Sequence, residues 1–155
     1  MINLIDDRDY RLWILLRHTF DMVFRARNKE LEEFDITSRQ AYLLHGIKVY
    51  GDSATIANLS KWMSRRPHTV GNMLITMEKE QLIEKTKLRS NKQSAICSLT
   101  EKGEQAFIKS TELESIHEVM SIFSEDDLQT MEKILRKLKD KAESQLIDDF
   151  SSTFP

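Results

Sequence analysis

The chain has 155 residues, of which 40% are hydrophobic and 31% are charged, and its formal net charge is −2. This length and composition predict one compact domain that buries roughly 70% of the surface its unfolded chain exposes. There is no run of about 18 apolar residues and no signal peptide, and the one cysteine excludes an internal disulfide and a cysteine-rich zinc site. We therefore expect a soluble, cytoplasmic protein that does not bind a membrane.

The N-terminal third of the chain predicts two helices. The first runs from Asp9 to Leu31, because apolar side chains recur at helical spacing at Leu12, Trp13, Leu16, Phe20, Val23 and Phe24. Thr37 and Gln40 have the spacing of a capping box, which predicts a second helix that continues to about Val49. Gly51 then favours the end of this helix.

The next segment predicts a helix, a tight turn and another helix. Thr55 is a typical capping residue, and after it apolar residues recur at the spacing of one buried face, at Ile56, Leu59 and Met63. Ser64-Arg65-Arg66 interrupts this pattern. Pro67 fits the first turn of a new helix, because the N–H that it lacks has no partner there. We expect this helix to run from about Pro67 to Glu80.

This second helix has two different faces. Its buried face is predicted to consist of Val70, Met73, Leu74 and Met77. Another stripe carries the polar side chains His68, Thr69, Asn72 and Thr76. Such a face, preceded by Arg65 and Arg66, suits a helix whose N-terminal end enters the major groove of DNA. There Asn72 would pair with adenine, and Arg66 with guanine or a phosphate. Taken alone, the face also fits ordinary solvated surface.

Two short strands are predicted to follow. Leu82–Lys87 and Ala95–Leu99 alternate apolar and polar residues as half-buried strands do, and Leu88–Ser94 is a polar loop between them. The predicted fold class is therefore mainly α with a small β-hairpin wing, a winged helix-turn-helix. Cys97 in the second strand is interpreted as a small buried or partly buried filler, with an oxidant sensor as the alternative.

The C-terminal third predicts two more helices. Thr100 caps one that we expect to extend to about Phe123, and Ser124 followed by three acidic residues opens the last. On the last helix a three-four apolar spacing runs through Leu128, Met131, Leu135, Leu138, Ala142 and Leu146. This seam either pairs with a second chain, through the first and last helices of both, or packs against the first helix of its own chain.

Charge is distributed unevenly along the sequence. From Lys61 to Gln93 there are eight basic and three acidic residues, a balance of +5. Residues 1–60 have a balance of −1 and residues 94–155 a balance of −6. A basic module within an acidic chain is typical of a segment that binds phosphates, with the acidic parts facing away from DNA or toward a partner chain.

Four segments of the chain resemble the MarR family of transcriptional regulators: Ile36–Leu44, the helix-turn-helix, Met77–Ile83 and Leu99–Gly103. The resemblance covers residues 10–147, and a strand that ends in Leu-Thr-Glu-Lys-Gly after a basic hairpin is its most specific part. It implies a homodimer with six helices and a wing in each chain, which binds inverted-repeat operators in double-stranded DNA. Members are often released from DNA by a small ligand or by oxidation.

The resemblance also implies an organisation within a single domain, 1–155. Residues from about 37 to 100 would form the DNA-binding winged-helix lobe. Residues from about 9 to 31 and from about 101 to 147 would form the dimerisation helices. Two recognition helices about 34 Å apart would then match successive major grooves on one side of the duplex.

The chain departs from the family pattern at two places. Gln81 stands where family members usually have glycine, so it must adopt a left-handed backbone at about 1–2 kcal/mol or end the helix in another way. Asn91-Lys92-Gln93 replaces the usual Asp-Arg-Arg of the wing, so Arg89 or Lys92 must supply the contact there. Because lysine is strongly hydrated, whereas arginine favours narrow minor grooves, we expect weaker readout by the wing.

These patterns together predict a sequence-specific DNA-binding regulator, a homodimeric repressor. The predicted major-groove contacts are Arg65, Arg66, His68, Thr69, Asn72 and Thr76, and Arg89 and Lys92 are predicted to meet the minor groove or phosphates. A competing hypothesis is a winged-helix module that binds another protein and has lost operator recognition.

A small-molecule pocket is also implied by the resemblance, between the dimerisation helices and the DNA-binding lobe. It would be lined by Trp13, Arg17, Phe20, Tyr42 and His45, with Arg17 or His45 facing an anionic or phenolic group of an aromatic effector. The alternative is that these aromatic residues belong to the core.

Catalytic and cofactor motifs are absent from the sequence. It has no glycine-rich phosphate loop, no Gly-x-Ser-x-Gly and no His-Glu-x-x-His, and its four histidines lack the spacing of metal ligands. We therefore expect no enzymatic activity, no cofactor and no metal site.

Overall fold

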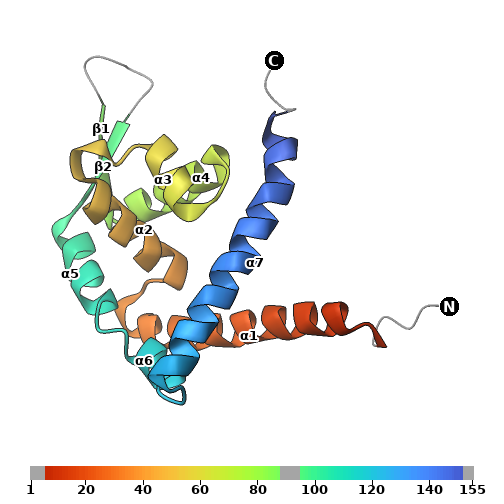
Figure 1. Ribbon diagram of the computed structural model, residues 1–155. Helices are drawn as coiled ribbons and strands as arrows, with labels where there is room; N and C mark the ends of the chain where they lie inside the picture. The colour runs from red at the N-terminus through yellow and green to blue at the C-terminus, as the bar shows by residue number, and fades with distance from the viewer. Residues whose placement is uncertain (1–5, 88–94, 152–155) are drawn as a thin grey trace. The chain divides into compact units, whose positions relative to one another are not determined.

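The computed structural model describes residues 6–87 and 95–151, with the side chains as far as residue 146. The chain divides into two compact units, Met1–Ile116 and His117–Pro155. In chain order the elements are α1 (Arg8–Leu31), η2 (Glu32–Phe34), α2 (Ser38–Tyr50), η3 (Gly51–Ser53), α3 (Ile56–Met63), α4 (Pro67–Lys79), β1 (Ile83–Lys87), β2 (Ala95–Leu99), α5 (Glu101–Ser110), α6 (Glu114–Met120) and α7 (Glu125–Ser151) (Figure 1). The fold is mainly helical with a two-stranded wing, so the predicted fold class is confirmed.

Capping side chains begin the helices at the positions that the sequence predicted. The Thr37 N–H donates to Gln40 Oε1 at 2.8 Å and Thr37 Oγ1 accepts from the Gln40 N–H, so the capping box of α2 is confirmed. Thr55 caps α3, Thr100 caps α5, and Pro67 is the first residue of α4. These polar caps satisfy N–H groups that have no partner within their own helix.

The core of the first unit is formed where α2, α3, α4, α5 and the hairpin meet. In Figure 1, α3 and α4 lie beside α2, close to the hairpin. Its fully buried side chains are Leu31, Leu43, Leu44, Leu59, Val70, Leu74, Met77, Leu82, Ile83 and Cys97. The buried face predicted for α4 is confirmed, since Val70, Leu74 and Met77 are fully buried and Met73 packs against them from the edge. Burial of this stripe fixes which faces of α4 remain outside.

The two predicted strands pair as an antiparallel hairpin. Ile83 lies opposite Leu99, and Lys85 lies opposite Cys97. The Cys97 N–H also donates to the Ala54 carbonyl at 2.9 Å, which ties the wing to the segment before α3. The predicted tip of the wing, Leu88–Ser94, lies outside the described residues.

The helix predicted from Thr100 to Phe123 is wrong, because α5 ends at Ser110 and α6 begins at Glu114. Leu113 between them has a left-handed backbone, with φ of 57°. The cause lies on α1, where Arg27 donates to the Ser110 carbonyl and Glu30 accepts from the N–H groups of Glu114, at 3.0 Å, and Ser115, at 3.1 Å. One side chain of α1 thus ends α5, and another caps α6.

Gln81 adopts the left-handed backbone that the sequence offered as one of two possibilities, with φ of 60°. The Leu82 N–H donates to the Met77 carbonyl at 2.9 Å, and the Gln81 N–H donates to the Glu78 carbonyl at 3.1 Å. These bonds close the C-terminal end of α4 in the manner usually seen with glycine. A residue other than glycine therefore costs about 1–2 kcal/mol here without changing the turn.

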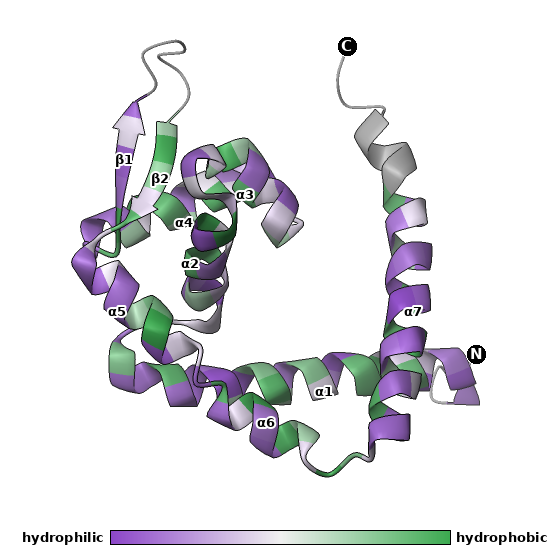
Figure 2. Ribbon diagram, turned by 60° about the vertical axis from the view of Figure 1, so that its left-hand side comes forward, coloured by the Kyte–Doolittle hydropathy of each residue, from purple (hydrophilic) through white to green (hydrophobic). Residues whose placement is uncertain are grey.

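The last helix, α7, carries the apolar seam predicted for the C-terminal end of the chain. Leu135, Leu138 and Leu146 are exposed, and Leu128 and Met131 are partly buried. The rest of the helix is dominated by polar and charged residues, as its colouring in Figure 2 shows. Of the helices that the structure describes, none has both the length and the apolar character needed to span a membrane.

Candidate nucleic-acid interface

The outward side of α4 carries the side chains predicted to contact the major groove. Arg65, Arg66, His68, Thr69, Asn72 and Thr76 are all exposed. A left-handed residue at the end of α3, Ser64 with φ of 50°, turns the chain, so that Arg65 and Arg66 directly precede the first turn of α4. The turn therefore places two guanidinium groups beside the positive end of the helix dipole, where phosphates bind most readily.

Three of these side chains are available for a ligand. In the part of the chain that the structure describes, the Asn72 amide and the guanidinium groups of Arg65 and Arg66 make no hydrogen bond and no ion pair. By contrast, the Thr76 hydroxyl donates to the Asn72 carbonyl at 3.2 Å, and Thr69 Oγ1 lies 3.5 Å from His68 Nε2. An asparagine amide can pair with the N6 and N7 atoms of adenine, and an arginine with guanine.

The basic residues of this segment differ in their availability to phosphates. Lys61, Lys79 and Lys87 are exposed, together with Arg65 and Arg66. Lys85 instead pairs with Glu78 at 2.8 Å, and its side chain is mostly buried. The predicted contacts Arg89 and Lys92 lie outside the described residues. The positive surface of the described interface therefore centres on the turn before α4.

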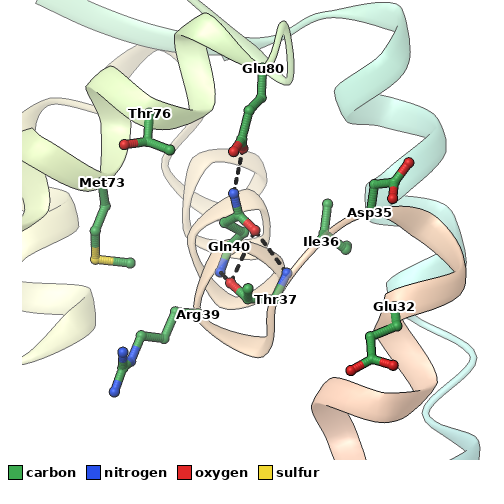
Figure 3. A pocket seen from close by; sticks show the side chains of 9 residues that line it. All are labelled: Glu32, Asp35, Ile36, Thr37, Arg39, Gln40, Met73, Thr76 and Glu80. Carbon is green, nitrogen blue, oxygen red and sulfur yellow. Dashed lines mark hydrogen bonds between the residues drawn. The ribbon is translucent and has the colours of Figure 1, made fainter.

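A hollow of about 510 Å³ lies beside α4, between its C-terminal half and the start of α2. Figure 3 shows Gln40 at its centre, bonded to Thr37 on one side and to Glu80 on the other. Gln40 Nε2 donates to Glu80 Oε2 at 2.6 Å, so the residue that completes the cap of α2 also holds the end of α4. The lining residues are Glu32, Asp35, Ile36, Thr37, Arg39, Gln40, Met73, Thr76 and Glu80. Three carboxylates against one arginine make this hollow unsuited to a phosphate.

A second hollow, of about 320 Å³, contains part of the predicted ligand pocket. Its lining residues are Arg27, Ser38, Ala41, Tyr42, His45, Phe107, Ser110, Thr111, Leu113 and Ile116. Tyr42 and His45 are thus brought together, and both contact the Trp62 ring, with centroids 5.1 and 5.3 Å away.

The other residues predicted for the pocket lie elsewhere on α1 and do not line this hollow. The Trp13 ring stacks on Tyr10, the Phe20 ring stacks on Phe24, and Arg17 Nε lies 3.8 Å from an oxygen of Asp21. The arginine that lines the hollow is Arg27, which is paired with Glu30.

Arg27 and Glu30 form a buried ion pair that the sequence analysis missed. Arg27 Nη1 lies 2.6 Å from Glu30 Oε1, and the two side chains are only 10% and 14% exposed. Burial raises the pKa of Glu30, but the hydrogen bonds from Arg27 and Ser115 and the Arg27 charge outweigh it, so the pKa is about 2. The sequence does indicate that Arg27 is buried. Arg27 stands three residues after Phe24 and four residues before Leu31, so it shares the inward stripe of α1 with them.

Cys97 is 1% exposed, in the core beneath the hairpin. Burial raises the pKa of its thiol, so the reactive thiolate is disfavoured. This environment favours the filler interpretation over the oxidant sensor. Across the described residues, no cluster of three or more histidine, cysteine or carboxylate side chains is placed to hold a metal ion.

Solved structures of transcriptional regulators share this fold. The organohalide-sensing regulator RdhR is 24% identical, with a TM-score of 0.81 over 87% of this chain and 81% of its own. MepR of S. aureus, in a DNA complex, is 24% identical, with a TM-score of 0.77 over 83% and 96%. A cysteine-to-serine mutant of MarR from E. coli, complexed with operator DNA, is 21% identical, with a TM-score of 0.75 over 83% and 93%.

Sequence comparison gives no further assignment, since no family profile and no curated protein matches the chain. The matches cover 81% to 96% of the neighbours' own chains and 83% to 89% of this chain, and these neighbours are regulators of one family. The chain therefore has the winged-helix fold of the MarR-family transcriptional regulators.

Proposed function

We propose that the chain is a MarR-family regulator that represses transcription as a homodimer bound to an inverted-repeat operator, and that it acts by binding rather than by catalysis. The observation that carries the proposal is α4, whose inner stripe is fully buried while Arg66 and Asn72 stand exposed without partners in the described chain. One neighbour of the same fold has been solved with operator DNA and another in a DNA complex, which supports this choice.

DNA binding is tested by fluorescence anisotropy on the duplex upstream of the coding region, with a scrambled duplex as control. We expect at least about 10³-fold preference for the specific duplex at near-physiological salt, and a steep loss of affinity as salt rises. Asn72→Ala should weaken specific binding about 10-fold or more, because it removes one bidentate base contact. Equal, weak binding to both duplexes would favour a module that binds another protein.

The proposed homodimer is supported by apolar side chains that remain exposed on two helices. On α1 these are Leu12, Trp13, Leu15, Leu16, Phe20 and Met22, and on α7 they are Ile134, Leu135, Leu138 and Leu146. In Figure 2, apolar segments recur along α1. A monomer rarely leaves two such stripes in water, and pairing of two chains would cover them.

Dimerisation is tested by the double variant Leu135→Asp/Leu138→Asp. We expect light scattering to give the mass of a single chain, because two carboxylates in the seam would lose their hydration on pairing. Affinity for the operator should fall roughly 100-fold, since each half-site is then bound independently. Ser144→Asp, on the polar side of the same helix, is the matched control. A double variant that keeps the dimer mass would place the interface elsewhere.

We extend the proposal to a small aromatic or phenolic effector in the hollow lined by Tyr42 and His45. His45 and the Tyr42 hydroxyl are polar groups of this hollow that can face a phenolic oxygen, and Phe107 is an aromatic wall. The similar fold of RdhR has been solved with 2,4-dichlorophenol bound, which supports a ligand of this class. Such an effector would favour those conformations of the proposed homodimer in which the spacing of its two DNA-binding lobes does not match successive major grooves. The effector would thereby weaken DNA binding.

A further inference from the structure

One apolar side chain stands on the outward side of α4, among the polar residues. Ile75 is 47% exposed, whereas Val70, Leu74 and Met77 of the same helix are fully buried. The exposed part of this aliphatic side chain gains nothing from its contact with water. Its location, one turn after Asn72, makes it part of the surface proposed to face DNA.

Gly71 lies one turn before Ile75 on the same side of the helix. Among the residues that the structure describes, a Cβ atom added there would meet no atom within 4 Å, so this part of the fold does not need glycine at this position. Glycine within a helix is less stable than alanine. Because Gly71 has no side chain, it leaves a space beside Ile75 on the surface of α4. A group of a bound molecule can approach the helix closely there.

The positions of these residues match a known mode of major-groove reading. His68, Gly71, Asn72 and Ile75 stand at intervals of three, four and seven residues along one helix. Homeodomain recognition helices contact bases with residues at the same intervals, including an asparagine at the third position that pairs with adenine. If Asn72 pairs with adenine, Ile75 lies one turn further along the same groove.

The chemistry of an aliphatic side chain selects one feature of the groove. Among the four bases only thymine presents an apolar group there, its C5 methyl, and apolar side chains contact it. We propose that Ile75, in the space left by Gly71, reads the methyl group of one thymine in each operator half-site. This inference rests on the proposed function and adds a specificity-determining residue to it.

The experiment replaces single thymines by uracil, which removes the methyl group and keeps the base pairing. The half-site is first defined by selection from random duplexes, and each thymine in it is then changed in turn. We expect one replacement to lower the affinity of the wild type roughly three- to fivefold, the effect of one buried methyl group. Ile75→Ala should bind the thymine and uracil duplexes equally.

Ile108→Ala is the matched control, since Ile108 is an isoleucine on α5 that is 60% exposed. This variant should keep the discrimination between thymine and uracil. Gly71→Leu fills the space beside Ile75 and should weaken binding to the thymine duplex at least about tenfold, because bulk at a closely packed contact forces a shift.

Two results would overturn the inference while leaving the regulator intact. Specific binding that is insensitive to every uracil replacement would show that no methyl group is read, and discrimination that persists in Ile75→Ala would assign the reading to another residue. If no specific duplex is selected at all, the proposed function fails, and the inference fails with it.

Discussion

Gly103→Ala is expected to destabilise the protein by about 3 kcal/mol or more, because overpacking at this site has no flexible side chain to displace. An added Cβ would lie 1.9 Å from the Leu82 carbonyl oxygen and 2.9 Å from its carbon, both backbone atoms. Hydrogen bonds of Thr100 keep the first turn of α5 close to the chain that follows α4. The Thr100 hydroxyl accepts from the Gly103 N–H at 3.1 Å and donates to the Gln81 carbonyl at 2.5 Å. Urea unfolding followed by tryptophan fluorescence measures the loss.

Gly71→Ala is the matched control for this substitution. Its added methyl group meets no described atom within 4 Å, so we expect it to stabilise α4 by about 0.5–1 kcal/mol. The two substitutions therefore have opposite signs for the same chemical change. A loss of stability below about 1 kcal/mol in Gly103→Ala would show that the first turn of α5 moves freely away from Leu82.

The close contact of Gly103 with Leu82 explains why the segment Leu99–Gly103 contains a glycine. Leu99–Gly103 was the most specific segment of the family pattern, but the pattern gives no reason for its glycine. In the structure Gly103 lets the first turn of α5 approach the chain directly after α4. Lys102 Nζ donates to the Glu80 carbonyl at 3.0 Å in the same contact. The end of α4 is thus held by α5 on one side and by Gln40 of α2 on the other.

Local signals were sufficient to predict the helix-turn-helix and the hairpin. Thr37, Thr55 and Thr100 each cap the helix that follows, and Pro67 begins α4. These features depend on residues within one turn of each other, so they are visible in a short window of sequence. The buried stripe of α4 follows in the same way from its spacing.

The features that sequence reasoning missed depend on residues far apart in the chain. The break between α5 and α6 is imposed by Arg27 and Glu30, which stand 83 to 85 residues away from Ser110 and Ser115. Apolar residues keep their helical spacing across the break. A prediction from local sequence therefore joins α5 and α6 into one helix. The same holds for the second hollow, where Arg27 of α1 meets Tyr42 and His45 of α2. The family resemblance had implied Trp13, Arg17 and Phe20 for this pocket, and these residues do not line the hollow.

Glu30→Gln is expected to cost roughly 3 kcal/mol near neutral pH, because it leaves Arg27 buried without a counter-charge. The pKa of Glu30 falls from 4.5 to about 2 in the folded protein. A shift of this size corresponds to a contribution of roughly 3 kcal/mol to the free energy of unfolding, which agrees with the expected cost of the substitution. A folded pKa below the unfolded value gives stability that is complete above pH 4.5 and is lost as the pH falls toward 2.

The difference in unfolding free energy between wild type and Glu30→Gln should therefore shrink with acidity, to roughly half near pH 3. Comparing the two proteins at each pH removes the contribution of the other carboxylates. Glu132→Gln is the control, since Glu132 pairs with Arg136 on α7 with both side chains more than half exposed. It should change stability by less than about 0.5 kcal/mol at any pH. A constant difference between wild type and Glu30→Gln from pH 7 to 3 would mean that Glu30 acts through its shape at the start of α6 rather than through its charge.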